Sequence, residues 1–286
     1  MRFASPDEFR DTPQKAVTLF GMSGVGKTRL ASMLRRSKWF HYSVDYRIGT
    51  RYMGEHIVDN FKREAMRVPL LRDLLRSDSI YISSNITFEN LEPLSTYLGK
   101  PGNRKRGGLS FEEYRRRQDR HRAAEIAALR DVPTFIGKAQ DIYGYRHFVC
   151  DTGGSLCEVV DLDDPADPVI RALADNTLIL YIRGSADHAR TLVKRFQNAP
   201  KPMYYPPALL ADWWQAFKTG HGIDRDDDVN PDAFAVWGFE QLIHHRMPLY
   251  ERIARDHGYV IEASEVAAVR NVAGFVDLVC RAIARA

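Results

Sequence analysis

One short segment limits the folds open to this chain more than any other. Residues 21–28 read Gly-Met-Ser-Gly-Val-Gly-Lys-Thr and fit the pattern GxxxxGKT without a mismatch. Residues 16–20 before it form an apolar run typical of a buried strand, and residues 29–36 after it place apolar side chains at helical spacing. A strand, a glycine-rich loop and a helix in this order predict a phosphate-binding loop, and hence a nucleoside triphosphate as ligand.

The chemistry of this loop gives its residues distinct roles. Glycines let successive backbone N–H groups curl around the β-phosphate. Lys27 is predicted to bridge the β and γ phosphates and to stabilise charge during transfer, and the Thr28 hydroxyl is predicted to ligate Mg²⁺. The predicted nucleotide-binding residues of the loop are Gly21, Met22, Ser23, Gly24, Val25, Gly26, Lys27 and Thr28.

Composition favours one α/β core with insertions. The 286 residues have ordinary apolar and charged fractions, and no run approaches the roughly 18 apolar residues of a membrane span. The polar start of the chain lacks the layout of a signal peptide, so we expect a cytoplasmic protein without a membrane partner. The three cysteines have no CxxC spacing and are expected to be buried thiols. A net charge of +4 favours anionic ligands without requiring nucleic acid.

Two further strands are predicted to end in a carboxylate. Residues 39–44 precede Asp45, and residues 146–150 precede Asp151 and a glycine pair. In open parallel sheets the ligand crevice forms at the carboxyl ends of the strands, so both carboxylates are expected near the phosphate-binding loop. Asp151 is a candidate to hold Mg²⁺ through water, with a turn-forming aspartate as the alternative. Residues 177–182 and 259–263 read as two more strands, and 273–286 reads as a closing helix.

The middle of the chain is basic. Residues 99–108 are rich in glycine, lysine and arginine and predict an exposed loop, and Ser110 with Glu113 predicts the capping box of a helix that runs to Pro133. Residues 100–130 hold ten basic and four acidic side chains, a local charge of +6. The arginines of 115–122 suit a nucleic-acid backbone, or else form a solvated face balanced by nearby acids; sparse aromatics favour the solvated face.

These features, taken in order, resemble shikimate kinase and its relatives among the nucleoside monophosphate kinases. Asp45-Tyr46-Arg47-Ile48 matches the second half of the family's DxDxxI motif, with Ser43 in place of the first aspartate. Thr152-Gly153-Gly154-Ser155 is similar to its TGGG turn. The segment from Arg246 to Ala254 matches RxPLYxxxA, the most discriminating of these similarities. The resemblance covers roughly residues 15–66 and 146–284.

The resemblance implies roles for residues outside the loop. Asp45 would orient the acceptor hydroxyl and take its proton, with a helix N-cap or a surface acid as the alternative. Arg63, Gly153, Gly154 and Arg246 would contact the acceptor. Arg195 and Lys201, in a segment similar to the family's lid, would reach the nucleotide phosphates when the lid closes. The cofactors implied are ATP and Mg²⁺, although no residue that reads the base is evident.

The expected fold is an α/β P-loop fold of the kinase type, a parallel sheet between helices, in one domain over residues 1–286. Residues 67–145 are expected to be an insertion and 196–240 an expanded lid. The expected activity is Mg·ATP-dependent transfer of a phosphoryl group to a hydroxyl of a small, anionic metabolite. Two alternatives stay open: a P-loop enzyme that acts on nucleic acid through the helix at 115–122, and a nucleotide-dependent interaction protein that has lost kinase chemistry. Neither the acceptor nor the oligomeric state follows from the sequence.

Overall fold

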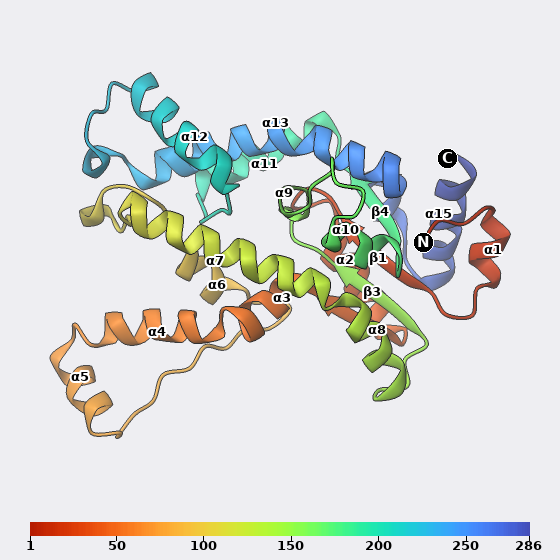
Figure 1. Cartoon of the computed structure of the whole chain (residues 1–286), viewed down its shortest axis with the longest axis horizontal. Coiled ribbons are helices and arrows are strands. Elements are labelled where there is room, and N and C mark those ends of the chain that lie inside the picture. The colour runs from red at the N-terminus through yellow and green to blue at the C-terminus, as the bar shows by residue number, and fades with distance from the viewer. The chain divides into compact units, whose positions relative to one another are not determined.

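A computed structural model describes all 286 residues and contains one parallel β-sheet flanked by helices (Figure 1). The strand order is β2-β3-β1-β4-β5, and every neighbouring pair is parallel. The predicted α/β fold with a parallel sheet is therefore confirmed. The strands are β1 (Ala16–Phe20), β2 (Trp39–Ser43), β3 (His147–Asp151), β4 (Leu178–Arg183) and β5 (Gly258–Glu262).

The helices occupy most of the remaining chain. They are α1 (Pro6–Asp11), α2 (Lys27–Arg36), α3 (Val44–Arg47), α4 (Gly54–Ala65), α5 (Pro69–Arg76), α6 (Glu92–Leu98), α7 (Phe111–Arg130), α8 (Val132–Asp141), α9 (Leu156–Val159), α10 (Pro168–Ala174), α11 (Ala186–Asn198), α12 (Pro207–Gly220), α13 (Pro231–His257), α14 (Ala263–Ala268) and α15 (Val272–Ala284). Short turns of other helix types are η1 (Ile48–Tyr52), η2 (Arg104–Arg106) and η3 (Asp226–Asp228). None of these helices is both long and apolar enough to span a lipid bilayer.

The chain divides into two compact units. The sheet unit comprises Met1–Val44, Glu125–Ala199 and Val236–Ala286, and contains all five strands. The helical unit comprises Asp45–Ala124 and Pro200–Ala235. The segment at 67–145, expected to be an insertion, supplies residues to both units, because Glu125 onward belongs to the sheet unit.

Crossover direction places the helices of the sheet unit on both faces of the sheet. In the order β2-β3-β1-β4-β5, the connection from β1 to β2 runs toward one edge of the sheet, and every later connection runs toward the other edge. Because such crossovers are right-handed, α2 lies on one face of the sheet, and α8 and α10 lie on the other. Helix α10 packs on α8, and α1 packs on α15. Strand β4 is buried from Leu178 to Ile182, as expected for a strand covered on both faces.

The helical unit is organised around the first part of α7. Tyr114 Oη donates to the carbonyl of Met203 at 2.9 Å, and the Gln118 side chain accepts from the backbone of Tyr205 at 2.9 Å. The Phe111 ring stacks on Trp214 of α12, with ring centroids 4.8 Å apart. These contacts hold the two separate chain segments of this unit together.

The position of Asp45 differs from the expected one, and a proline divides the helices that follow it. Helices α4 and α5 are separate because Pro69, which cannot donate a backbone hydrogen bond, begins α5. Helix α3 begins at Val44, so Asp45 lies in the first turn of a helix, two residues after β2 ends at Ser43, rather than at the end of the strand itself.

Candidate functional site

The phosphate-binding loop joins the end of β1 to the start of α2, and its glycines are required by its shape. Gly21, Gly24 and Gly26 have φ angles of +135°, +77° and +100°. A Cβ at Gly21 would lie 2.6 Å from the carbonyl oxygen of Ile182. Only glycine fits such a backbone without strain, so the predicted loop has the conformation that its sequence requires.

Lys27 lies inside this loop. Its ammonium nitrogen donates to the carbonyl oxygens of Gly21 and Met22, both at 2.8 Å, and its side chain is buried. The exposed Thr28 follows it in the first turn of α2, where no acidic residue is present. The N-terminus of α2 therefore brings together the positive end of the helix dipole, the Lys27 ammonium and the Thr28 hydroxyl. This combination suits the phosphates of a nucleotide and the Mg²⁺ that accompanies them.

His188 is a part of this site that sequence reasoning missed. It lies in the first turn of α11, and its Nε2 is 3.0 Å from the carbonyl oxygen of Ser23 in the loop. A Cβ at Gly24 would lie 3.3 Å from the same imidazole ring, and one at Gly184 2.9 Å from it. The histidine thus packs directly on the exposed tip of the loop. A long-range contact of this kind leaves no pattern in the sequence.

A cavity of about 540 Å³ opens beside the loop in the sheet unit. Its volume lies in the range of small-ligand sites. It lies at the carboxyl ends of β4 and β5, next to Gly24 and Gly26. Its lining residues are Gly24, Val25, Gly26, Arg29, Arg183, Ser185, His188, Glu262, Ala263, Ser264, Val266 and Ala267.

Polar groups of the cavity wall are hydrogen-bonded to each other and to the backbone. Arg183 donates through Nε and Nη2 to one oxygen of Glu262, at 3.0 and 2.6 Å. Arg29 donates to the backbone carbonyls of Val266 and Val269. The sequence showed no residue that reads a base, and the structure supplies Arg183, Glu262 and the exposed Ser264 as candidates.

Asp151 lies at the carboxyl edge of the sheet beside the loop. It is the last residue of β3 and is paired in register with Leu19 of β1 and Ser43 of β2. The carboxylate is buried, and its Oδ2 lies 3.8 Å from Nε2 of His41. Ser43, the last residue of β2, is therefore the neighbour of Asp151 in the sheet. The chain thus offers one carboxylate and the Thr28 hydroxyl for Mg²⁺, a donor set that suits this ion when phosphates and water complete the shell.

The glycine turn after β3 is anchored at several points. Thr152 Oγ1 donates to the carbonyl of Leu19 at 3.1 Å, and Tyr250 Oη donates to the carbonyl of Gly154. Ser155 Oγ donates to the buried carboxylate of Glu125, at 2.8 and 2.7 Å from its two oxygens. Ser155 thus helps to fix the turn.

Arg246, predicted to clamp an anionic group of the acceptor, is already engaged within the protein. Its Nε and Nη2 donate to the two oxygens of Glu158 at 2.9 and 2.7 Å. Burial alone would lower the pKa of Arg246, but the charge of Glu158 and its hydrogen bonds outweigh burial and hold that pKa above its usual value. Nη1 faces the turn, 3.3 Å from where a Cβ of Gly154 would lie. The charge available to an acceptor is therefore largely compensated.

The other predicted residues belong to different units. Arg195 is exposed on α11 of the sheet unit. Asp45, half-buried in α3, and the exposed Arg63 and Lys201 belong to the helical unit.

The arginines of 115–122 are only partly solvated. Arg117 is buried and donates to Glu113 at 2.7 Å, to Asn60 at 2.8 Å and to the carbonyl of Tyr97. Arg116 also pairs with Glu113, and Arg120 donates to the Tyr97 hydroxyl at 3.0 Å. These contacts hold α7 to α4 and α6 and pair some of its own side chains, so the helix offers nucleic acid fewer cations than its sequence suggests.

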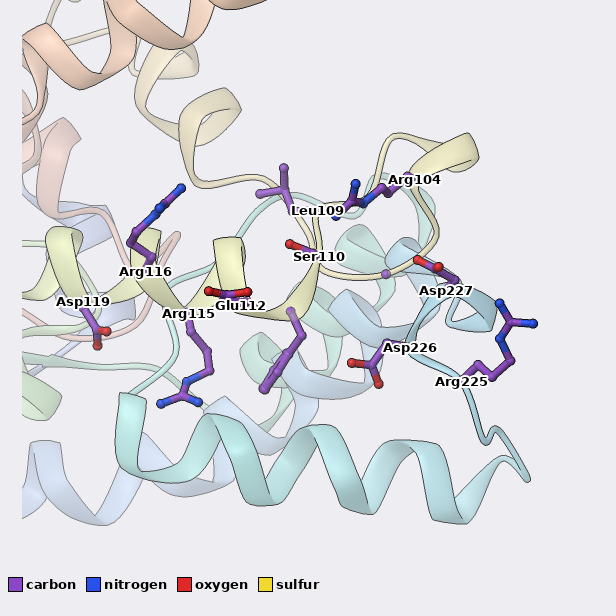
Figure 2. A pocket seen from close by; sticks show the side chains of 12 residues that line it. Arg104, Leu109, Ser110, Glu112, Arg115, Arg116, Asp119, Arg225, Asp226 and Asp227 are labelled. Atoms are coloured by element: carbon purple, nitrogen blue, oxygen red, sulfur yellow. The ribbon is translucent and has the colours of Figure 1, made fainter.

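A cavity of about 720 Å³ in the helical unit is lined by charges of both signs (Figure 2). Figure 2 shows arginines interspersed with acidic side chains from α7 and from η3. Of these, Arg116 is paired with Glu113, and Asp226 accepts from Lys218 at 2.7 Å. The charged lining residues are Arg104, Glu112, Arg115, Arg116, Asp119, Arg225, Asp226 and Asp227. Equal numbers of each sign give no preference for a polyanion.

Comparison with known proteins adds little to the fold assignment, which rests on the sheet and the loop. No protein-family model matches the chain, and no curated protein sequence does. Among solved structures, the chain is similar to shikimate kinase from Bacteroides thetaiotaomicron, with 14% sequence identity and a TM-score of 0.40 over 95% of this chain and 96% of that one. Because this similarity is low, we base the assignment on the sheet and the loop between β1 and α2. The chain has a P-loop α/β fold.

Proposed function

We propose that the protein is a Mg·ATP-dependent kinase that transfers the γ-phosphoryl group to a hydroxyl of a small, anionic metabolite. The observation that carries the proposal is the buried Lys27 within the glycine loop, next to a cavity large enough for a nucleoside. The matches to the glycine turn and to RxPLYxxxA favour a metabolite kinase over other P-loop enzymes.

Nucleotide binding would use the sheet unit. The loop amides from Gly21 to Thr28 would surround the phosphates, and the Lys27 ammonium would turn from the loop carbonyls to the β and γ phosphates. The cavity at Arg183 and Glu262 would take the base and ribose. Thr28, with Asp151 acting through water, would hold Mg²⁺, which when bound neutralises charge on the phosphates.

Transfer would place the acceptor hydroxyl in line with the γ-phosphorus. The hydroxyl oxygen forms the new P–O bond while the bond to the β-phosphate oxygen breaks and ADP leaves. Asp45 would orient the hydroxyl and accept its proton. Because the transition state is loose, positioning and charge stabilisation provide most of the rate.

The proposal assigns binding roles to the remaining residues. Arg63 would hold an anionic group of the acceptor, and Gly153 and Gly154 would let the backbone approach it closely. Arg246 would face the acceptor through the side that contacts the glycine turn, with Glu158 fixing its orientation. Arg195 and Lys201 would contact the nucleotide phosphates and exclude water during transfer.

The test is ADP release from Mg·ATP by the purified protein, alone and with pools of hydroxylated acids, nucleosides, nucleotides, or short RNA and DNA. We expect one small-molecule pool to stimulate release, and Lys27→Ala to abolish the stimulation. Lys105→Ala, the same change at an exposed site of the helical unit, is the matched control and should retain it. Stimulation by nucleic acid alone, or no stimulation despite ATP binding, would contradict the proposal.

A further inference from the structure

A second cavity in the sheet unit lies at the opposite end of the sheet from the phosphate-binding loop. Its volume is about 520 Å³. Its wall comes from the two turns that enter β2 and β3, whereas the loop leaves β1 at the carboxyl end. Because these strands are parallel, the two sites are separated by the length of the sheet. The lining residues are Ser37, Lys38, Tyr143, Gly144, Tyr145, Arg146 and His147.

Positive charges are concentrated at this cavity. Trp39 and His147 are paired in register between β2 and β3, and the exposed Lys38 and Arg146, which directly precede them, both line the cavity. Neither side chain makes an ion pair or a hydrogen bond, and no acidic residue lines the cavity. Like charges that line the same cavity repel each other. A bound anion would remove this repulsion.

The backbone conformation of Lys38 also favours anion binding as the role of this cavity. Lys38 has a φ of +64°, directly after the C-cap of α2, at a position where glycine is the favoured residue. A lysine there is conformationally disfavoured, yet it supplies a cation to the cavity. Arg35 and Arg36, in the last turn of α2, add to the positive charge of this segment.

His147 offers a hydrogen-bond donor. Its Nδ1 accepts from the backbone N–H of Lys15 at 3.2 Å, so in the neutral ring the proton is on Nε2. The ring packs on Trp39, with centroids 4.8 Å apart, which fixes its plane. Tyr143, whose surface is 60% exposed, contributes a hydroxyl and an aromatic edge to the rim.

We propose that this cavity is a second binding site, separate from the phosphate-binding loop, for a small oxyanion such as the phosphate or carboxylate group of a metabolite. Lys38 and Arg146 supply the charge, and His147 supplies an N–H donor. The electrostatics around His147 agree with this assignment. Burial lowers the pKa of His147, and the charges of Lys15 and Arg146 lower it further. An oxyanion held beside the ring would raise that pKa.

The experiment is an NMR pH titration of His147 in the full chain, with Lys27→Ala as the background so that the phosphate-binding loop does not compete. The probes are inorganic phosphate, malonate and AMP, each up to about 10 mM, which saturates a site with a Kd of about 1 mM. The resonance is assigned by its loss in His147→Gln. We expect the pKa of His147 to rise with at least one probe.

Two variants separate binding from folding. Lys38→Gly removes the cation and places the favoured residue in the left-handed conformation, so the midpoint of denaturant unfolding should rise while the probe-induced shift of the His147 pKa is reduced. Arg146→Gln removes the second cation and should abolish that shift. A shift with phosphate or malonate supports a free oxyanion as ligand, and a shift with AMP alone supports a phosphate attached to a nucleoside. No shift with any probe, or a shift that persists in both variants, would overturn the proposal.

Discussion

Replacement of Glu158 by glutamine tests whether Arg246 serves mainly the fold or mainly a ligand. The two side chains form a deeply buried ion pair of the sheet unit, with 0% of the Glu158 side chain and 8% of the Arg246 side chain exposed. Glu158→Gln keeps the size of the side chain and one acceptor oxygen. It removes the negative charge and leaves the guanidinium buried without its counter-charge.

The expected loss of stability is about 3 kcal/mol. Removal of one partner from a buried pair costs about 3–5 kcal/mol, because the remaining charge stays desolvated. The lower end applies here because glutamine still accepts one of the two hydrogen bonds, at 2.9 and 2.7 Å in the parent protein. For a guanidinium chloride slope of about 5 kcal/mol/M, this loss lowers the unfolding midpoint by about 0.6 M.

The assay is guanidinium unfolding followed by circular dichroism, with two further variants. Asp163→Asn breaks the exposed pair with Arg252, where the Asp163 side chain is 87% exposed, and should change stability by less than about 1 kcal/mol. The double variant Glu158→Leu with Arg246→Met replaces the pair by apolar side chains of similar size. It should be more stable than Glu158→Gln, because no charge is left buried.

One result would refute this reasoning. If Glu158→Gln unfolds at the same midpoint as the parent protein, the guanidinium is not held by Glu158 in solution. If Arg246→Met then raises the KM for the acceptor without a change in stability, Arg246 is an acceptor ligand whose charge is available, as the resemblance to shikimate kinase implies.

Three further outcomes follow from the structure. Ser264→Trp should fill the cavity beside the loop and weaken ATP binding about tenfold or more. Tripolyphosphate, which lacks a nucleoside, should bind to this variant as it does to the parent protein. Equal weakening of both ligands would place the nucleoside elsewhere. The pKa of His147 is lowered in the folded state, by burial and then by Lys15 and Arg146, so the unfolded chain takes up the proton first and stability falls as pH drops below the unfolded pKa of about 6.5. His147→Gln should therefore make the loss of stability between pH 7 and pH 5 smaller, as measured by urea unfolding at each pH. An unchanged dependence of stability on pH would contradict this. Burial raises the pKa of the thiols of Cys150 and Cys157, so a thiol reagent should leave both unlabelled in the native protein and label both after unfolding. Rapid labelling of either thiol in the native protein would show that the strand and turn that carry them open readily.

The part of the site that the sequence predicted is the part built from neighbouring residues. The loop from Gly21 to Thr28, the strand before it and the helix after it depend on local spacing and on glycine geometry, and the structure has all three. The pairing of Ser43 with Asp151 is of a different kind. It depends on strand order, which the sequence does not reveal, although both strands were recognised.

The remainder depends on contacts between distant residues. Glu158 and Arg246 are 88 positions apart, and Ser23 and His188 are 165 apart. Periodicity and motif spacing carry no information on such pairs. The arginines of 115–122 show the same limit, because the sequence shows their number but not that Arg117 points into the helical unit to bind Tyr97 and Asn60.

The helical unit consists of two stretches of chain, and this affects how the protein emerges from the ribosome. Tyr114 and Gln118 of the first stretch bond to Met203 and Tyr205 of the second. Roughly 110 residues are synthesised between the end of the first stretch and the end of the second, or about 5–20 s of translation. During that interval the side chains that will contact the second stretch are open to chaperones and to proteases. A change in the first stretch is therefore expected to reduce yield in the cell more than stability in the purified protein.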